Sequence, residues 1–184
     1  MITIEELLFR LFVNRDDCYA EQQGKEYSSK KESVTLELIN QHLLGEKTIG
    51  LYQLLKDKVK WGCYDFDKNT LEEFENAKLL FAYLVKQGLN PLFEMSGGGE
   101  HKCHIWIFSD TTASKMQAFM KSICNKTKIY PHEIFPKQTN VGDDGYGNLV
   151  KLPLGINQKT GKRSHFLDSN FNEITTEQAV EKLQ

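Results

Sequence analysis

The spacing of apolar residues along the chain predicts several helices. Apolar positions three or four residues apart form one face of a helix. This spacing occurs in residues 4–12, 34–44, 71–87 and 114–124, and a last short helix is expected from Glu177. The polar, lysine-bearing stretch 14–31 separates the first two of these segments. We therefore expect a helical beginning that contains an exposed loop.

Short runs rich in β-branched and aromatic residues predict strands between and after these helices. The runs cover residues 48–55, 59–67, 91–95, 104–108, 132–135, 149–152 and 165–167. Turns rich in Gly, Asn and Asp join the later runs. This arrangement favours an α+β fold, with a largely antiparallel sheet and flanking helices.

Composition and length are those of one globular domain. The 184 residues are 40% hydrophobic and 11% aromatic, enough to bury a core. We divide the domain into a helical N-terminal portion (1–46), a sheet-bearing centre (47–170) and a C-terminal helix (171–184). No apolar run approaches the roughly 20 residues of a membrane helix. Residues 1–12 are acidic and amphipathic rather than a basic leader, so we expect a cytoplasmic protein without a membrane partner.

Cysteines and lysines narrow the possible chemistry. The four cysteines contain no C-x-x-C pair, so neither a zinc knuckle nor a disulfide framework is indicated. The formal net charge is −2, yet lysines gather in residues 25–31 and 137–163. Because nucleic-acid binding depends on where basic residues gather, local basic patches matter more than this sum.

Asp65 and Asp67 lie two residues apart at the end of a predicted strand. The period of two places both carboxylates on one face of the sheet. Two carboxylates so close repel each other unless a cation intervenes, and Mg²⁺ prefers carboxylate, water and phosphate oxygens. The pair therefore indicates a divalent metal site; alternatively it caps the following turn or is simply solvated.

A serine and glycine turn precedes a strand that carries histidine. Consecutive glycines let backbone N–H groups approach a polyphosphate and form an anion nest. In this chain Ser96, Gly97 and Gly98 supply such a turn, and either His101 or His104 follows it toward a phosphate. The alternative is a flexible hairpin turn with two surface histidines.

Three further charged positions complete the candidate chemistry. Glu133 stands beside apolar strand residues, where it can complete a metal site with the two aspartates. Lys151 lies at a strand edge, and Lys137 and Lys162 belong to the later basic region. These lysines are suited to neutralise a triphosphate or a nucleic-acid backbone, although surface lysines are commonly just solvated.

Taken in order, these motifs resemble the archaeo-eukaryotic primase superfamily. The segments that carry the resemblance are Tyr64-Asp65-Phe66-Asp67, 96–106, Glu133, 148–154 and 159–162. Residues 11–17, 42–45 and 48–55 are similar to the primase-polymerases of prokaryotic defence loci, including CRISPR-associated ones. The resemblance implies that the centre of the chain is a palm with the fold of an RNA-recognition motif.

The resemblance also implies a function and a set of roles. Asp65, Asp67 and Glu133 are expected to bind two Mg²⁺ or Mn²⁺ ions. The expected triphosphate ligands are Ser96, Gly97, Gly98, Lys151 and one of His101 and His104. The expected activity is that of a template-dependent nucleotidyltransferase, a DNA primase or polymerase that joins nucleoside triphosphates on template DNA and primer.

The template is expected along Arg15, Lys137 and Lys162, with further domains or defence-system proteins as partners. One alternative is a metal-dependent endonuclease of the rolling-circle type, which uses two histidines on one strand face. His101 and His104 are three residues apart, so a strand would direct them to opposite faces. The other alternative is a nucleotide- or nucleic-acid-binding module without turnover.

Overall fold

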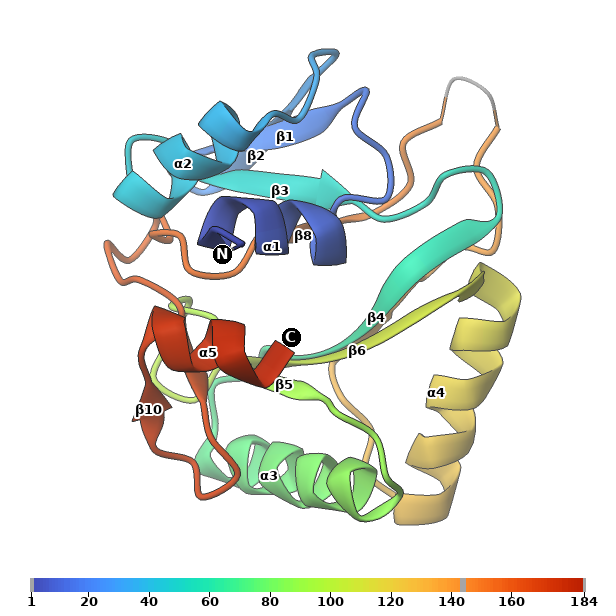
Figure 1. Ribbon diagram of the computed structural model, residues 1–184. Helices are drawn as coiled ribbons and strands as arrows, with labels where there is room; N and C mark the ends of the chain where they lie inside the picture. The colour runs from blue at the N-terminus through green and yellow to red at the C-terminus, as the bar shows by residue number, and fades with distance from the viewer. Residues whose placement is uncertain (1, 143–144, 184) are drawn as a thin grey trace.

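The computed structural model describes residues 2–142 and 145–183 (Figure 1). Its helices are α1 (Ile4–Phe12), α2 (Leu36–Leu44), α3 (Leu71–Lys86), α4 (Ala113–Thr127) and α5 (Thr176–Leu183). Helices α1 to α4 each begin at a threonine whose side chain accepts a hydrogen bond from a backbone N–H of the first turn. Such caps satisfy donors that a helix leaves unpaired, so local sequence fixes where these helices start.

The strands form two antiparallel sheets. The first has the order β2-β1-β3-β8 and the second the order β10-β9-β5-β6-β4-β7. The bounds in the first sheet are β1 (Tyr19–Gln23), β2 (Glu26–Lys30), β3 (Ile49–Tyr52) and β8 (Leu149–Lys151). Those in the second are β4 (Lys58–Phe66), β5 (Leu92–Met95), β6 (Cys103–Thr112), β7 (Glu133–Phe135), β9 (His165–Leu167) and β10 (Glu173–Ile174). The predicted α+β class with antiparallel sheet and flanking helices is confirmed.

The expected exposed loop within residues 14–31 is wrong, because this stretch holds the β1–β2 hairpin. The N-terminal portion is therefore not purely helical. The hairpin turns at Gly24, which has a positive φ of 62° that glycine adopts without strain. Strand β2 has no buried residue, so apolar alternation could not reveal it; the backbone ladder to β1 holds it in place. The two-residue strand β10 was missed for its brevity.

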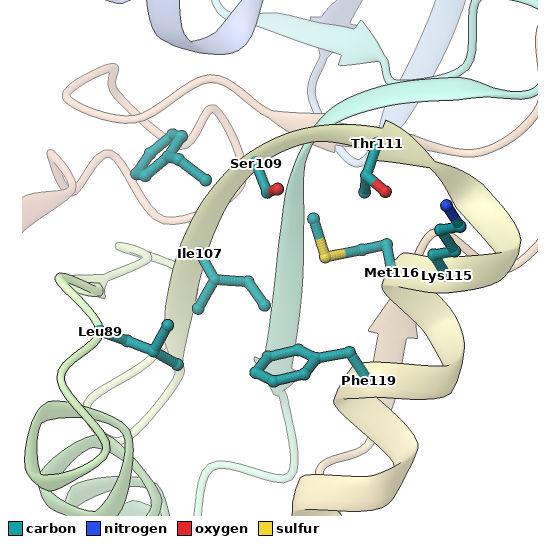
Figure 2. Close-up of a pocket in the computed structure, with 8 residues that line it drawn as sticks. Leu89, Ile107, Ser109, Thr111, Lys115, Met116 and Phe119 are labelled. Carbon is teal, nitrogen blue, oxygen red and sulfur yellow. The ribbon is translucent and has the colours of Figure 1, made fainter.

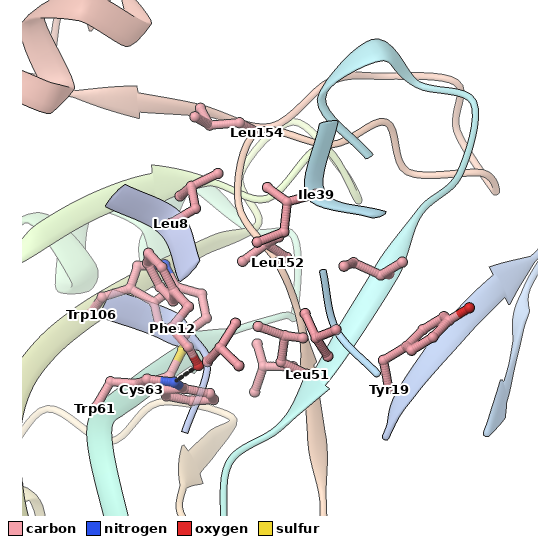
Figure 3. Packing of buried hydrophobic residues seen from close by; sticks show 14 of the residues in the cluster. Leu8, Phe12, Tyr19, Ile39, Leu51, Trp61, Cys63, Trp106, Leu152 and Leu154 are labelled. Carbon is pink, nitrogen blue, oxygen red and sulfur yellow. Dashed lines mark hydrogen bonds between the residues drawn. The ribbon is translucent and has the colours of Figure 1, made fainter. Parts of the chain in front are cut away.

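An aromatic and aliphatic cluster joins the two sheets (Figure 3). Phe12 of α1 packs edge-on against Trp106 of β6, with ring centroids 5.0 Å apart. Trp61 of β4 contacts the same tryptophan at 5.0 Å and donates from Nε1 to the Phe12 carbonyl oxygen at 2.9 Å. Leu51 of β3 belongs to this cluster. The first sheet is thereby held over one face of the second.

Helices α3 and α4 cover the opposite face of the six-stranded sheet (Figure 1). Side chains alternate between the two faces along β4: Cys63 belongs to the cluster between the sheets, and Tyr64 and Phe66 to the cluster under the helices. Asp65 lies between Tyr64 and Phe66 in sequence, so it faces the space between the sheets. Within the described ranges, no helix is both long enough and apolar enough to cross a membrane.

Candidate active site

Four charged side chains stand side by side across the six-stranded sheet. Glu94 of β5 pairs with His104 of β6, His104 pairs with Asp65 of β4, and Asp65 pairs with Glu133 of β7. Residues directly opposite each other in an antiparallel pair project from the same face. These four residues, which we call the polar row, therefore lie on the face directed at the first sheet.

Three members of the polar row, Asp65, His104 and Glu133, line a pocket of about 290 Å³ between the two sheets. The lining residues predicted from the sequence are Asp65, Asp67, Ser96, Gly98, His104, Glu133 and Lys151. Others that sequence reasoning missed include Tyr27, Lys102 and Asn157, whereas Lys159 belongs to the segment 159–162 that carries the family resemblance. The structure thus brings most of the predicted metal and triphosphate ligands to one place, although they come from widely separated segments.

Three carboxylates form the acidic half of the pocket. Burial raises the pKa of Asp65 above its ordinary value, and the charges of Asp67 and Glu133 raise it further, while His104 opposes them. Asp67 forms an ion pair with Lys102, whose Nζ lies 2.9 Å from Oδ1, and Glu133 forms an ion pair with Lys137. Among the described residues, no three His, Cys, Asp or Glu side chains are gathered closely enough to hold a metal.

The donor chemistry nevertheless fits a divalent cation. Carboxylate oxygens are the ligands that Mg²⁺ and Mn²⁺ prefer, and repulsion among Asp65, Asp67 and Glu133 is relieved by a cation between them. Lys102 and Lys137 would compete with such an ion for Asp67 and Glu133. Both lysine side chains are partly exposed, so solvent is available to receive them.

The glycine turn is braced by the basic hairpin of residues 156–163. Gly97 has a φ of 75°, and a Cβ there would lie 2.7 Å from the carbonyl oxygen of Lys162. Thr160 donates from its hydroxyl to the Gly97 carbonyl at 2.6 Å. The Ser96 hydroxyl accepts from the Gly98 N–H at 3.3 Å. Glycine is therefore required at position 97 both for its backbone conformation and for the close approach of the hairpin.

The structure separates the two candidate histidines. His104 lines the pocket, where its Nδ1 lies 2.9 Å from Glu94 and its Nε2 lies 3.6 Å from Asp65. Burial alone lowers the pKa of His104, but Glu94 and Asp65 outweigh burial and raise it. The His101 ring instead lies 5.9 Å from the Phe74 ring of α3. The endonuclease alternative requires two imidazoles that converge on one metal ion. The imidazoles of His101 and His104 do not converge in this way.

Lys151 occupies the side of the pocket that β8 provides. Its side chain is only 7% exposed, and its Nζ donates to the Ser164 hydroxyl at 3.0 Å. Burial lowers the pKa of Lys151, and the nearby carboxylate of Glu94 offsets part of that effect. Together with His104, this ammonium makes the half of the pocket opposite the acids suited to an anion.

The remaining predicted residues are not brought together. Arg15 is buried and forms a bidentate ion pair with Asp17, and it does not line the pocket. Lys137 is exposed and paired with Glu133, a residue that lines the pocket, while Lys162 is exposed on the basic hairpin. These three basic side chains therefore do not form one continuous surface.

A second hollow, of about 320 Å³, has a different character (Figure 2). It lies against α4 on the other face of the sheet, where Ile107, Met116 and Phe119 give it apolar walls. Lys115 is the charged residue in this lining, which contains no carboxylate within the described part of the chain. The polar row and its pocket are therefore the better candidate for chemistry.

Comparisons with known proteins agree with this geometry. The family model described as "TOTE conflict system, Archaeo-Eukaryotic Primase domain" matches residues 22–182. A search of curated protein sequences gives no match. The structure is similar to the archaeo-eukaryotic primase domain of the cyanophage S-2L primase-polymerase, with a TM-score of 0.53 and 11% identity over 97% of this chain and 95% of that chain. It is also similar to the polymerase domain of Mycobacterium tuberculosis ligase D in complex with DNA, with a TM-score of 0.53 and 8% identity over 98% and 84% of the two chains.

Proposed function

Because the chain belongs to the archaeo-eukaryotic primase domain family of TOTE conflict systems, we propose that it is a template-dependent DNA primase-polymerase. The superfamily predicted from the motifs is confirmed. The observation that carries the proposed activity is the shared pocket, which places three acids beside His104 and Lys151. We further propose that the protein works in the cytoplasm, where nucleoside triphosphates are available.

The acidic half of the pocket is the proposed metal site. Asp65, Asp67 and Glu133 would hold two Mg²⁺ or Mn²⁺ ions, in agreement with their oxygen donors and their mutual repulsion. Bound ions of this kind lower the pKa of an attacking hydroxyl and stabilise a pyrophosphate leaving group. The carboxylates themselves fix the position at which these charges develop.

The other half of the pocket binds the triphosphate in this proposal. Ser96 and Gly98 line this half, with Gly97 between them in sequence, and all three would turn hydrogen bonds toward the phosphates. His104 and Lys151 supply positive charge. Lys102 and Lys159 line the same pocket and add two more cations. The protein thus contributes mainly positioning and charge neutralisation, which dominate phosphoryl-transfer catalysis.

We place template and primer along the exposed basic side chains near the pocket, Lys137 and Lys162. Arg15 is left out because Asp17 already neutralises it. Affinity for primed DNA should fall as salt rises, by a log–log slope of about −0.9 for each phosphate neutralised. An affinity that stayed constant from low to high salt would contradict this placement. Further domains or defence-system proteins would provide the additional contacts to the template.

The proposed activity is tested by incorporation of labelled nucleotides. The protein is incubated with a primed template, all eight nucleoside triphosphates and Mg²⁺ or Mn²⁺. We expect extension by the wild type and by Asp110→Asn, an exposed acid at the far end of β6, but not by the double variant Asp65→Asn, Asp67→Asn. Products formed without primer would identify priming as well as extension.

Other results would overturn the proposal. Extension that survives in the double variant would remove Asp65 and Asp67 from catalysis. Metal-dependent triphosphate binding without any product would favour the non-catalytic module. A covalent adduct between a tyrosine and DNA would favour the endonuclease.

A further inference from the structure

Glu94 is a charged residue at the centre of the fold that the sequence motifs did not identify. Its side chain is fully buried. Oε2 accepts hydrogen bonds from His104 Nδ1 at 2.9 Å and from Trp106 Nε1 at 2.8 Å. Oε1 lies 3.7 Å from Lys151 Nζ. One carboxylate therefore faces both of the buried side chains that stand on the triphosphate side of the pocket.

The buried carboxylate of Glu94 is compensated by the side chains around it. A buried carboxylate is costly unless cations or hydrogen bonds compensate for its lost hydration. Burial alone raises the pKa of Glu94, but Lys151 and His104 lower it well below its usual range, so the carboxylate is ionised. The carboxylate contacts the His104 ring and lies 3.7 Å from the Lys151 ammonium. Both of these side chains line the pocket, and Glu94 does not.

The position of Glu94 in the sheet sets its role apart from that of the metal-binding acids. In the register of the strands, His104 stands between Glu94 and Asp65. A cation held by Asp65 would therefore be separated from Glu94 by the imidazole. The hydrogen bond to Nδ1 fixes the ring so that Nε2 is directed toward Asp65 and the pocket.

We infer that Glu94 is a positioning residue for the triphosphate: its carboxylate orients the His104 ring and retains the Lys151 ammonium, so that both side chains are directed at the phosphate groups. This inference rests on the proposed function of the pocket. A purely structural acid would differ in its consequences. It would stabilise the fold through the Trp106 hydrogen bond and leave triphosphate affinity untouched.

The matched variants are Glu94→Gln and Trp106→Phe. The first keeps the size of the side chain and one acceptor oxygen but removes the charge. The second removes a hydrogen bond to the same oxygen, yet Trp106 does not line the pocket. Both are expected to unfold at lower denaturant concentration than the wild type. A loss of triphosphate affinity is expected of Glu94→Gln alone.

The measurement is calorimetric titration with a non-hydrolysable α,β-imido deoxynucleoside triphosphate and Mg²⁺, on variants shown by circular dichroism to be folded. Glu94→Gln should raise the Kd by about tenfold or more, equivalent to about 1.4 kcal/mol or more. The nucleotide KM should rise by a similar factor and kcat should change less, because ground-state binding is what is lost. Trp106→Phe should stay within about twofold of the wild type, since it alters no group that lines the pocket.

Failure of the inference and failure of the proposed function give different results. A wild type that does not bind the triphosphate would remove the proposed function. Wild-type binding with unchanged or tighter binding by Glu94→Gln would overturn the role of Glu94 alone. If Glu94→Gln does not fold, Glu94→Asp retains the charge on a side chain shorter by one methylene. It should weaken binding about threefold, since it cannot reach both cations, and binding equal to the wild type would overturn the inference.

Discussion

The buried imidazole of His42 ties helix α2 to the segment that follows Lys151. Its Nε2 lies 2.9 Å from the Leu152 carbonyl oxygen and 3.2 Å from that of Pro153. Its Nδ1 accepts a hydrogen bond from the Ile49 N–H at 3.1 Å. This pattern is that of a neutral ring with its proton on Nε2. A second proton would have to be placed on Nδ1, directly against the Ile49 N–H.

The uptake of this proton by the unfolded chain should therefore destabilise the protein in mild acid. Burial, with a smaller contribution from the charge of Lys151, lowers the pKa of His42 from 6.5 to about 4. Each pKa unit is worth about 1.4 kcal/mol, so the change amounts to about 3 kcal/mol of unfolding free energy. Below pH 6.5 the unfolded chain takes up the proton and the native state does not. The stabilisation is thus complete above pH 6.5 and is lost as the pH falls to about 4.

The assay is urea unfolding at closely spaced pH values from about 7.5 to about 4. This range covers the interval between the pKa values of His42 in the unfolded and native states. His42→Gln is the non-titrating variant, and His132→Gln, at an exposed position, is the control. Between pH 7 and pH 4 the wild type and the control should each lose about 3 kcal/mol more than His42→Gln. If all three proteins lose the same free energy, His42 is not the group that senses acid, and the reasoning from its hydrogen bonds is refuted.

Two further predictions concern the glycine beneath this imidazole and a lysine of the pocket. A Cβ at Gly155 would lie 1.9 Å from His42 Cε1, so Gly155→Ala should cost about 3 kcal/mol or more in urea unfolding, whereas Gly142→Ala, with open space around it, should stay within about 0.5 kcal/mol. Lys102→Ala should strengthen Mn²⁺ binding up to about fivefold in nucleotide-free titrations followed by electron paramagnetic resonance, because the ammonium no longer competes for Asp67. Weaker binding would indicate that Lys102 does not compete with the metal.

Sequence patterns predicted the local elements well and long-range partners poorly. The β-branched and aromatic residues of 59–67 correctly placed Asp65 in a strand, since strand propensity is a local property. That β4 lies between β6 and β7, and so brings His104 and Glu133 to either side of Asp65, depends on pairing between distant segments. The grouping of those residues was predicted through the family resemblance and not from their spacing.

The sequence around Glu94 predicts that its side chain is buried. It lies inside the apolar run Leu92-Phe93-Glu94-Met95, where an acid is expected to be buried and therefore paired. The identity of its partners could not be derived, because Lys151 reaches it from β8, a strand of the other sheet. A buried acid can be suspected from sequence, but the cations that compensate for it are known only once the two sheets are packed.

The polar row also depends on an irregularity at the other end of its strands. Val59 pairs with Thr111, whereas Trp61 pairs with Phe108, so β6 advances three residues while β4 advances two. Without this shift, Asp65 would stand opposite Ile105 instead of His104. Because neighbouring residues of a strand point to opposite faces, the imidazole would then lie under α3 and α4, separated from the carboxylates by the sheet. The geometry proposed for triphosphate and metal therefore requires the additional residue of β6, which lies in an exposed polar stretch far from the site.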